Sequence, residues 1–150
     1  MTFRLAPLLP DHVGEALTVQ RAAYVSEAQR YTQPLIPPLV ETVAEFQADL
    51  RVAIGAWVGH RLVGSVRGRV DGTRMEVARF SVAPDHQGTG VGRALLAGVE
   101  AAAPPEVTVF WLITGADSHD NQRLYGRAGY VAVGERTALG IRLLVMEKPR

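Results

Sequence analysis

Three glycines at every second position, Gly88, Gly90 and Gly92, stand between two apolar segments. The segment before them, residues 73–82, is predicted to be a strand, and the segment after them, residues 91–103, a helix. Because glycine has no Cβ, a ligand can approach the backbone closely at these positions. The first N–H groups of a helix have no intrahelical partners and lie at the positive end of the helix dipole. This combination predicts a binding site for a phosphate or pyrophosphate.

Two familiar phosphate-binding loops fit this stretch poorly. A P-loop needs Gly-Lys-Ser/Thr at the start of its helix, but the chain has a single lysine, Lys148, far from the loop. A dinucleotide-binding loop needs G-x-G-x-x-G early in a βαβ unit, with an acidic residue about 20 residues later. Here the third glycine comes one place too early, and residues 111–113 read Trp-Leu-Ile. The pattern that remains is Gln-x-x-Gly-x-Gly at Gln87, Gly90 and Gly92.

A second stretch with chemically useful spacing covers residues 114–130. Asp117 or Ser118 is predicted to cap a helix that extends to residue 128, and Gly129 is predicted to follow its end. Asn121 and Tyr125 are four residues apart, so both side chains would point from the same face of that helix.

Together the two stretches resemble the GCN5-related N-acetyltransferase (GNAT) family. The first, preceded by Val-Ala-Pro, is similar to the acetyl-CoA signature of the family. The second is similar to the signature in which a helix carries a tyrosine four residues before a glycine–aromatic pair. The resemblance extends over essentially the whole chain. It implies an α/β acyl-CoA N-acyltransferase fold in one domain, residues 1–150, with a mixed, mostly antiparallel sheet of about seven strands flanked by about four helices.

The resemblance also implies where acetyl-CoA would bind. The main chain at Phe80, Ser81 and Val82 would pair with the pantetheine arm and offer an N–H to the acetyl carbonyl. The pyrophosphate would rest on the N–H groups of the loop, with help from Arg93; the loop residues are Gln87, Gly88, Thr89, Gly90, Val91 and Gly92. Many members carry an asparagine seven residues before the tyrosine, where this chain has Ser118. Contact with the cofactor is therefore expected from Ser118, from Asn121 or from both.

Acetyl transfer needs a donor for the leaving thiolate and an acceptor for the proton of the amine. The resemblance assigns the first role to Tyr125, and an ordinary phenol is protonated at neutral pH. Glu76 lies on the strand leading into the loop and is the candidate base, with bulk water as an equal alternative. The favoured interpretation, however, is that Glu76 is a solvated or salt-bridged strand residue, paired for instance with Arg74 or Arg79. A β-bulge near Arg79 would change the face of the sheet to which the side chains of this strand point.

Two segments outside these motifs carry further expectations. The strand of residues 61–70 alternates, which places Arg67 and Arg69 on a solvated face or, less favoured, on a wall of the acceptor groove. The prolines of the segment 31–39 are expected to exclude regular helix. The resemblance to the GNAT family implies that this segment, with residues 136–141, lines the acceptor site.

Composition narrows the class of protein. A formal net charge of +1 without a basic cluster does not indicate nucleic-acid binding, and no metal-ligand spacing is present. The absence of cysteine excludes a covalent thiol intermediate. No signal pattern or membrane-spanning run is found, so a cytoplasmic protein without membrane partners is expected.

The predicted function is transfer of an acetyl group from acetyl-CoA to a primary amine of a small molecule or peptide, by direct attack in a ternary complex and without a metal. The alternatives are a non-catalytic module that binds or senses acyl-CoA, and an acyltransferase that uses another acyl-CoA or an oxygen acceptor. The resemblance also allows a homodimer.

Overall fold

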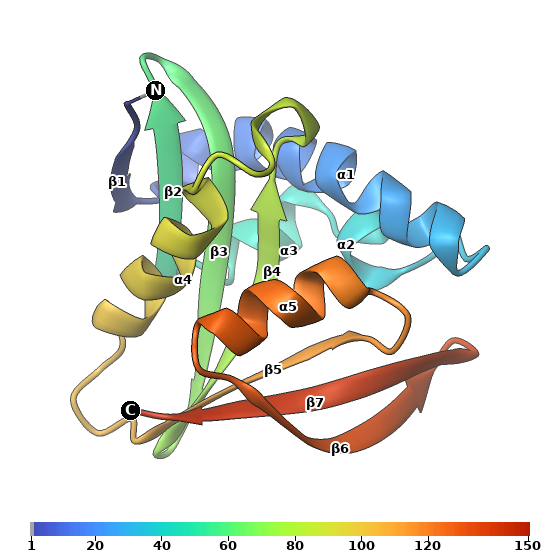
Figure 1. Ribbon diagram of the computed structural model, residues 1–150. Coiled ribbons are helices and arrows are strands. Elements are labelled where there is room, and N and C mark those ends of the chain that lie inside the picture. Colours follow the sequence, from blue (N-terminus) through green and yellow to red (C-terminus); the bar gives the residue numbers. More distant parts are fainter. Residues whose placement is uncertain (1) are drawn as a thin grey trace.

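A single seven-stranded sheet organises the chain in the computed structural model, which describes residues 2–150 (Figure 1). The strand order is β1-β2-β3-β4-β5-β7-β6. The strands are β1 (Arg4–Pro7), β2 (Val52–Val58), β3 (Arg61–Asp71), β4 (Arg74–Val82), β5 (Val109–Gly115), β6 (Val131–Ala138) and β7 (Ile141–Pro149). The helices are α1 (Val13–Arg30), α2 (Pro37–Val40), α3 (Val43–Gln47), α4 (Val91–Ala101) and α5 (His119–Arg127). Within residues 2–150, three of these five helices have seven residues or more, and the predicted α/β fold is confirmed.

The sheet opens between β4 and β5. Every other pair of neighbouring strands is antiparallel, but β4 and β5 are parallel and pair only from Arg74 to Glu76, opposite Val109 to Trp111. Beyond Glu76 the two strands diverge, and Figure 1 shows β4 and β5 running in clearly different directions. The β5-facing edge of β4, from Val77 to Val82, therefore has no strand partner.

β4 carries a bulge where it passes this opening. Arg79 and Phe80 together lie opposite Val66, because the register changes between Ser65 and Arg67 on β3. Arg79 has a φ of 54°, a left-handed conformation that is uncommon for residues with a Cβ. The bulge predicted near Arg79 is confirmed, and it re-aims the side chains on either side of it.

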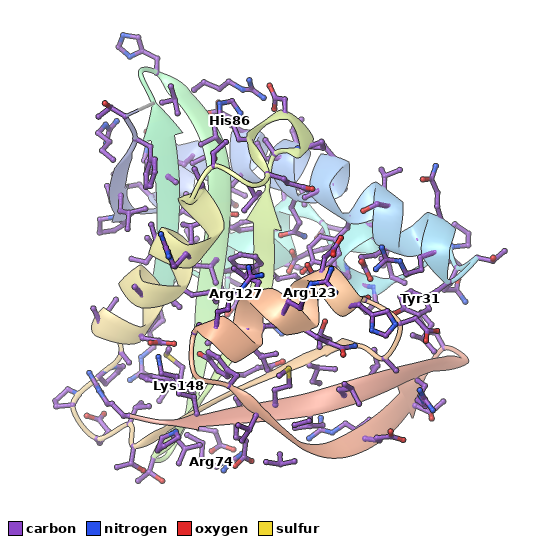
Figure 2. The ribbon with its side chains drawn as sticks, in the orientation of Figure 1. Tyr31, Arg74, His86, Arg123, Arg127 and Lys148 are labelled. Atoms are coloured by element: carbon purple, nitrogen blue, oxygen red, sulfur yellow. The ribbon has the colours of Figure 1, made fainter. Side chains whose placement is uncertain are left out.

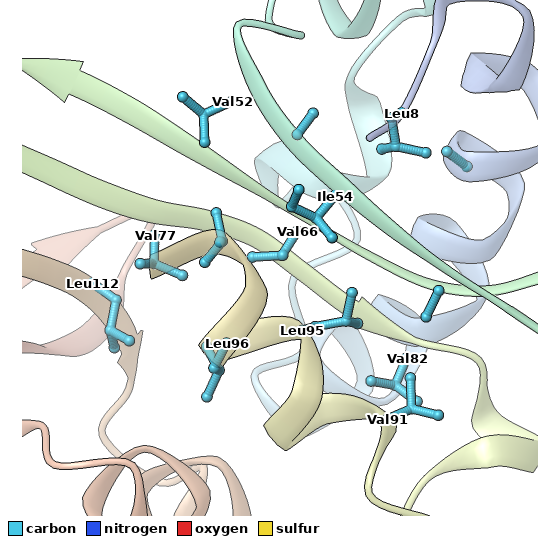
Figure 3. Packing of buried hydrophobic residues seen from close by; sticks show 14 of the residues in the cluster. Leu8, Val52, Ile54, Val66, Val77, Val82, Val91, Leu95, Leu96 and Leu112 are labelled. Atoms are coloured by element: carbon cyan, nitrogen blue, oxygen red, sulfur yellow. The ribbon is translucent and has the colours of Figure 1, made fainter. Parts of the chain in front are cut away.

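Helices cover both faces of the sheet (Figure 1). The buried face of α4 presents Val91, Leu95, Leu96 and Val99 to β2, β3 and β4, as Figure 3 shows in part. α1 packs against β3 and β4 from the opposite side. β3 is buried continuously from Leu62 to Gly68, as expected for a strand covered on both faces.

Arg67 is buried, and the prediction that it lies on a solvated strand face is wrong. Its side chain is 1 % exposed, lies over the ring of Phe46 and donates two hydrogen bonds to Glu41, of 2.6 and 3.0 Å. Further hydrogen bonds go to Gln20 and Asp49. The reason is tertiary: the chain from α1 to Asp49 folds over this face of β3 and supplies acceptors for both terminal nitrogens of the buried guanidinium.

The proline-rich segment contains one helical turn, α2, so the expectation of no regular helix there is wrong for Pro37–Val40. Pro37 and Pro38 occupy the first positions of the turn, where a missing N–H costs no hydrogen bond. Within residues 2–150, no helix has the length and apolar character needed to cross a bilayer.

Candidate active site

A cleft of about 720 Å³ lies where β4 and β5 diverge. Its walls come from the second half of α1, the end of β4, the glycine loop and α5. Nine of the residues predicted to form the site line this cleft: Phe80, Val82, Gln87, Gly88, Gly90, Gly92, Arg93, Asn121 and Tyr125. The two motifs of the sequence therefore meet at one place.

The glycine loop presents free backbone donors to the cleft. The first intrahelical hydrogen bond of α4 runs from the Ala94 N–H to the Gly90 carbonyl, at 3.1 Å. The N–H groups of Val91, Gly92 and Arg93 therefore precede the hydrogen-bonded part of the helix. Gly88 and Gly90 have φ values of 74° and 92°, and a Cβ at either position would meet no atom within 4 Å. This geometry suits a ligand that approaches the main chain itself.

Gly92 serves a different purpose from the other two glycines. A Cβ there would stand 2.9 Å from Cζ of Phe80, so the missing side chain lets the Phe80 ring pack against the start of α4. The Phe80 ring in turn meets Tyr125 edge-on, with ring centroids 5.9 Å apart. The interpretation that all three glycines clear space for a ligand is thus corrected at one position.

The turn before the loop, Pro84–His86, is held by charge and by short hydrogen bonds. Arg61 donates two hydrogen bonds of 2.8 Å to Asp85, and these hydrogen bonds lower the pKa of the Asp85 carboxyl well below its usual range. His86, labelled in Figure 2, accepts a hydrogen bond at its carbonyl from the Thr89 hydroxyl, at 2.6 Å. The Gln87 amide reaches back to the Val82 carbonyl at 3.3 Å. These contacts fix the loop relative to the end of β4.

Tyr125 lies at the inner wall of the cleft and is 6 % exposed. Burial raises the pKa of its phenol far above the ordinary value, and the nearby Tyr24 and Glu27 raise it further. The phenol is therefore protonated at neutral pH and can act as a hydrogen-bond donor. Asn121 is on the same face of α5 and also borders the cleft.

Glu76 is not among the residues that line the cleft. It lies in the part of β4 that is still paired with β5, opposite Trp111, and its carboxylate is 3.9 Å from the Arg69 guanidinium on β3. The expected ion-pair partners are engaged elsewhere, Arg74 with Glu147 and Arg79 with Glu41. The interpretation of Glu76 as a salt-bridged strand residue agrees with this arrangement, but the partner is Arg69, which strand register places opposite it, and not Arg74 or Arg79.

Four other predicted residues lie beside the cleft or behind its wall. Ser81 and Val91 are buried, and the Ser81 hydroxyl donates to the Arg79 carbonyl at 3.0 Å. Thr89 is exposed in the loop. Ser118 precedes α5 as predicted but makes no capping hydrogen bond with its side chain, which is fully buried and faces α1.

The sequence reasoning missed the contribution of α1. Tyr24 and Glu27 line the cleft, and Tyr31, just after the end of the helix, contacts the turn before α5 (Figure 2). The spacing of three and four residues between them places all three on one helical face. This polar face was the feature of the sequence that could have indicated their role.

The cleft also has a basic rim. Arg30, Arg93, Arg123 and Arg127 line it, from α1, α4 and α5. Figure 2 shows Arg123 and Arg127 on α5. Arg123 is paired with Asp120, one turn earlier on the same helix. Guanidinium groups beside free N–H groups favour a ligand with several phosphates.

Comparison with known proteins identifies the family and the fold. A family model described as the acetyltransferase (GNAT) family matches residues 19–130. The fold is similar to that of PaiA N-acetyltransferase from Thermoplasma acidophilum in complex with coenzyme A, at 13 % identity over 100 % of both chains with a TM-score of 0.80. It is similar to the ribosomal-protein-S18-alanine N-acetyltransferase from Escherichia coli, at 18 % identity over 99 % of this chain and 94 % of that one, also with a TM-score of 0.80.

A nourseothricin acetyltransferase is similar over a shorter span, 65 % of this chain and 64 % of that one, at 29 % identity and a TM-score of 0.60. No curated protein matches the chain. The match to the family model covers most of the sequence, and the chain belongs to the acetyltransferase (GNAT) family, whose members use acyl-CoA.

Proposed function

We propose that this protein transfers an acetyl group from acetyl-CoA to a primary amine by direct attack in a ternary complex. The observation that carries the proposal is the continuity of one cleft. Free N–H groups of the glycine loop lie at one part of its wall, and the protonated phenol of Tyr125 lies at another. The unpaired edge of β4 runs between them.

The residues present fit acetyl-CoA as a substrate. The pyrophosphate suits the free N–H groups of the loop and of the start of α4, where Gly88 and Gly90 leave the backbone uncovered. The pantetheine arm has amide groups that can pair with the open edge of β4 near Phe80 and Val82, as an added strand would. Arg123 and Arg127 lie where they can meet further phosphate charge.

The chemistry then follows from what lines the thioester end of the cleft. The nitrogen lone pair of the amine attacks the thioester carbonyl carbon, and the developing negative charge on the carbonyl oxygen needs a hydrogen-bond donor. An N–H of the open β4 edge can supply it. As the C–S bond breaks, the leaving thiolate takes a proton, and Tyr125 is the donor that the cleft offers. The products are an amide and coenzyme A.

The acceptor is proposed as a small-molecule or peptide amine. A library for the first screen should contain polyamines, amino acids, nourseothricin and a peptide with a free N-terminal alanine. The last two are chosen because the similar structures include a nourseothricin acetyltransferase and a ribosomal-protein-S18-alanine N-acetyltransferase. Release of coenzyme A is followed by thiol titration, which the protein does not disturb because it has no cysteine.

Titration calorimetry with acetyl-, propionyl- and succinyl-CoA tests the donor. We expect acetyl-CoA to bind, and to be consumed when a suitable amine is added. Binding without turnover of any amine would favour the non-catalytic acyl-CoA sensor. Preference for a longer acyl chain would correct the donor, and no binding of any acyl-CoA would overturn the proposal.

A further inference from the structure

We propose that Glu27 takes the proton from the attacking amine, and that Ser118 and Tyr31 are positioning residues that hold its carboxylate. This inference rests on the proposed acetyltransferase function and assigns the role that sequence reasoning gave to Glu76 or to bulk water.

Glu27 lies on the wall of the cleft, in company with Tyr24 and Tyr125. Its side chain is 18 % exposed, so the carboxylate is partly shielded from water yet open to the cleft. One carboxylate oxygen accepts a hydrogen bond of 3.2 Å from Arg30, and the other accepts one of 2.7 Å from Ser118. Both oxygens are therefore oriented by partners on two different elements.

The hydrogen bonds behind Glu27 have one consistent direction. The Asp117 N–H donates to the Tyr31 hydroxyl at 3.0 Å, and the Tyr31 hydroxyl lies 2.8 Å from the Ser118 hydroxyl. Because Ser118 gives its only proton to Glu27, Tyr31 must be the donor between the two hydroxyls. The chain of donors starts at a backbone N–H and ends on a carboxylate, which accepts only. These hydrogen bonds therefore hold the Glu27 carboxylate in place from behind the wall of the cleft.

Gly115 has no side chain, and this leaves room for the hydrogen-bonded hydroxyls of Tyr31 and Ser118. A Cβ there would overlap the Tyr31 hydroxyl and stand 2.6 Å from Oγ of Ser118. Gly115 is buried at the end of β5 and its φ is not left-handed, so close approach is the reason that the structure shows for a glycine. The series of hydrogen bonds from Asp117 to Glu27 thus depends on residues of α1, of β5 and of the turn before α5.

The charged and titratable groups around Glu27 are compatible with this role. Arg30 and Tyr24 face it from α1, and burial raises the pKa of Tyr24 to about 12, so that phenol stays neutral. Tyr125 faces the same cleft from α5 and is also neutral. The other cationic side chains that line the cleft are the rim arginines Arg93, Arg123 and Arg127.

With Glu27 as the base, every proton that moves in the reaction has a donor and an acceptor. While the C–N bond forms, the amine nitrogen becomes positively charged and its proton strongly acidic. Glu27 receives that proton, directly or through one water, and the carbonyl is restored as the C–S bond breaks. The thiolate takes the Tyr125 proton. Exchange with solvent then returns a proton to Tyr125 and removes one from Glu27, so the net reaction moves one proton from amine to thiol.

The test compares three variants for turnover and acetyl-CoA binding: Glu27→Gln, Glu76→Gln and the control Glu147→Gln. Glu147 suits the control because, like Glu27, it is an arginine-paired glutamate, and its partner Arg74 lies far from the cleft in Figure 2. We expect Glu27→Gln to lower kcat/KM for the amine by roughly 10²- to 10⁴-fold with acetyl-CoA affinity unchanged. Glu27→Asp should recover part of the loss, and Glu147→Gln should behave as wild type.

The positioning residues have a separate readout. Tyr31→Phe keeps the ring but removes the hydroxyl, so it should lower kcat with little change in the KM for acetyl-CoA. A purely structural role would instead lower the thermal midpoint and leave kcat of the folded fraction unchanged. That second pattern would overturn the part of the inference that concerns Tyr31.

The outcomes separate this inference from the proposed function. If wild-type protein fails to bind acetyl-CoA, the proposed function is wrong and the inference falls with it. If wild type turns over but Glu27→Gln stays within threefold of it, or Glu76→Gln shows the large loss, the inference alone is wrong. A crystal structure with acetyl-CoA adds a measurement that needs no acceptor. The Glu27 carboxylate should lie within roughly 7 to 10 Å of the acetyl carbonyl carbon, the reach of one amine and one water, and a greater distance would overturn the inference.

Discussion

The Ser118 hydroxyl donates a hydrogen bond of 2.7 Å to the Glu27 carboxylate, across 91 residues of sequence. It joins the turn before α5 to the second half of α1, and both α5 and α1 line the cleft. Ser118 is fully buried and does not line the cleft itself. The bond therefore connects the predicted cofactor motif to a residue that the motif does not contain.

Replacing Ser118 separates two roles for this residue. We expect Ser118→Ala to leave acetyl-CoA affinity within threefold of wild type and to lower kcat about 10-fold, the effect of losing one hydrogen bond to a charged group. Thr108→Ala, which removes an exposed hydroxyl near the start of β5, is the control. Calorimetry and steady-state kinetics give the two quantities. Weaker binding with unchanged kcat would instead support the sequence-based prediction that Ser118 contacts the cofactor.

Tyr125→Phe tests the proposed acid. The ring should keep its edge-on contact with Phe80, so acetyl-CoA should bind almost as tightly as to wild type. We expect kcat to fall about 10²-fold, because the leaving thiolate loses its proton donor. Unchanged turnover would remove Tyr125 from the mechanism and leave it as a packing residue.

Gly90 tests the position of the anion. Any side chain there is strained by the φ of 92°, so two variants of equal size are compared, Gly90→Gln and Gly90→Glu. We expect both to weaken acetyl-CoA binding, and the glutamate to weaken it about 10-fold more because its charge opposes a phosphate. Calorimetry measures the difference. Wild-type affinity in both variants would mean that the pyrophosphate lies elsewhere.

The buried Arg67–Glu41 pair should dominate stability on its side of the sheet. Arg67→Met leaves a buried carboxylate without its main partner, and we expect a loss of about 3 to 5 kcal/mol in the free energy of unfolding. Arg61→Met breaks an ion pair whose side chains are more than half exposed, so it should cost much less stability than Arg67→Met. Urea denaturation compares them, and equal losses would contradict this account.

The same pair predicts a pH dependence of stability. Burial raises the pKa of Glu41, but hydrogen bonds from Arg67 and Gln20 and the charge of Arg67 outweigh it, and the net pKa lies below the ordinary value of 4.5. A lowered native pKa stabilises the fold above the unfolded value and loses that contribution as pH falls through the native one. As the pH is lowered from 5, the free energy of unfolding of wild type should therefore decrease more than that of Glu41→Gln. Parallel curves for the two proteins would show that Glu41 does not contribute.

Local sequence signals were enough for the parts of the site that lie within one strand–loop–helix unit. The spacing of Gly88, Gly90 and Gly92 between a strand and a helix specifies the loop through backbone conformation and free N–H groups, both of which are short-range properties. The four-residue spacing of Asn121 and Tyr125 places them on one helical face for the same reason, and both line the cleft. Family resemblance supplied the mixed, mostly antiparallel sheet of about seven strands, which the observed sheet confirms.

Tertiary structure decided which charged side chains are buried, paired or presented to the cleft. Arg67 follows the alternation of an exposed strand residue, yet α1, α2 and α3 fold over it and provide its acceptors. Glu76 is beside Arg69 because of strand register. Glu27 has Ser118 as its partner because the turn before α5 packs against α1, where Tyr31 and Ser118 meet beside Gly115. Periodicity within one element reports which residues share a face of that element. It does not tell which residues of another element pack against that face. Ion-pair and hydrogen-bond partners come from those other elements, so the tertiary structure determines them.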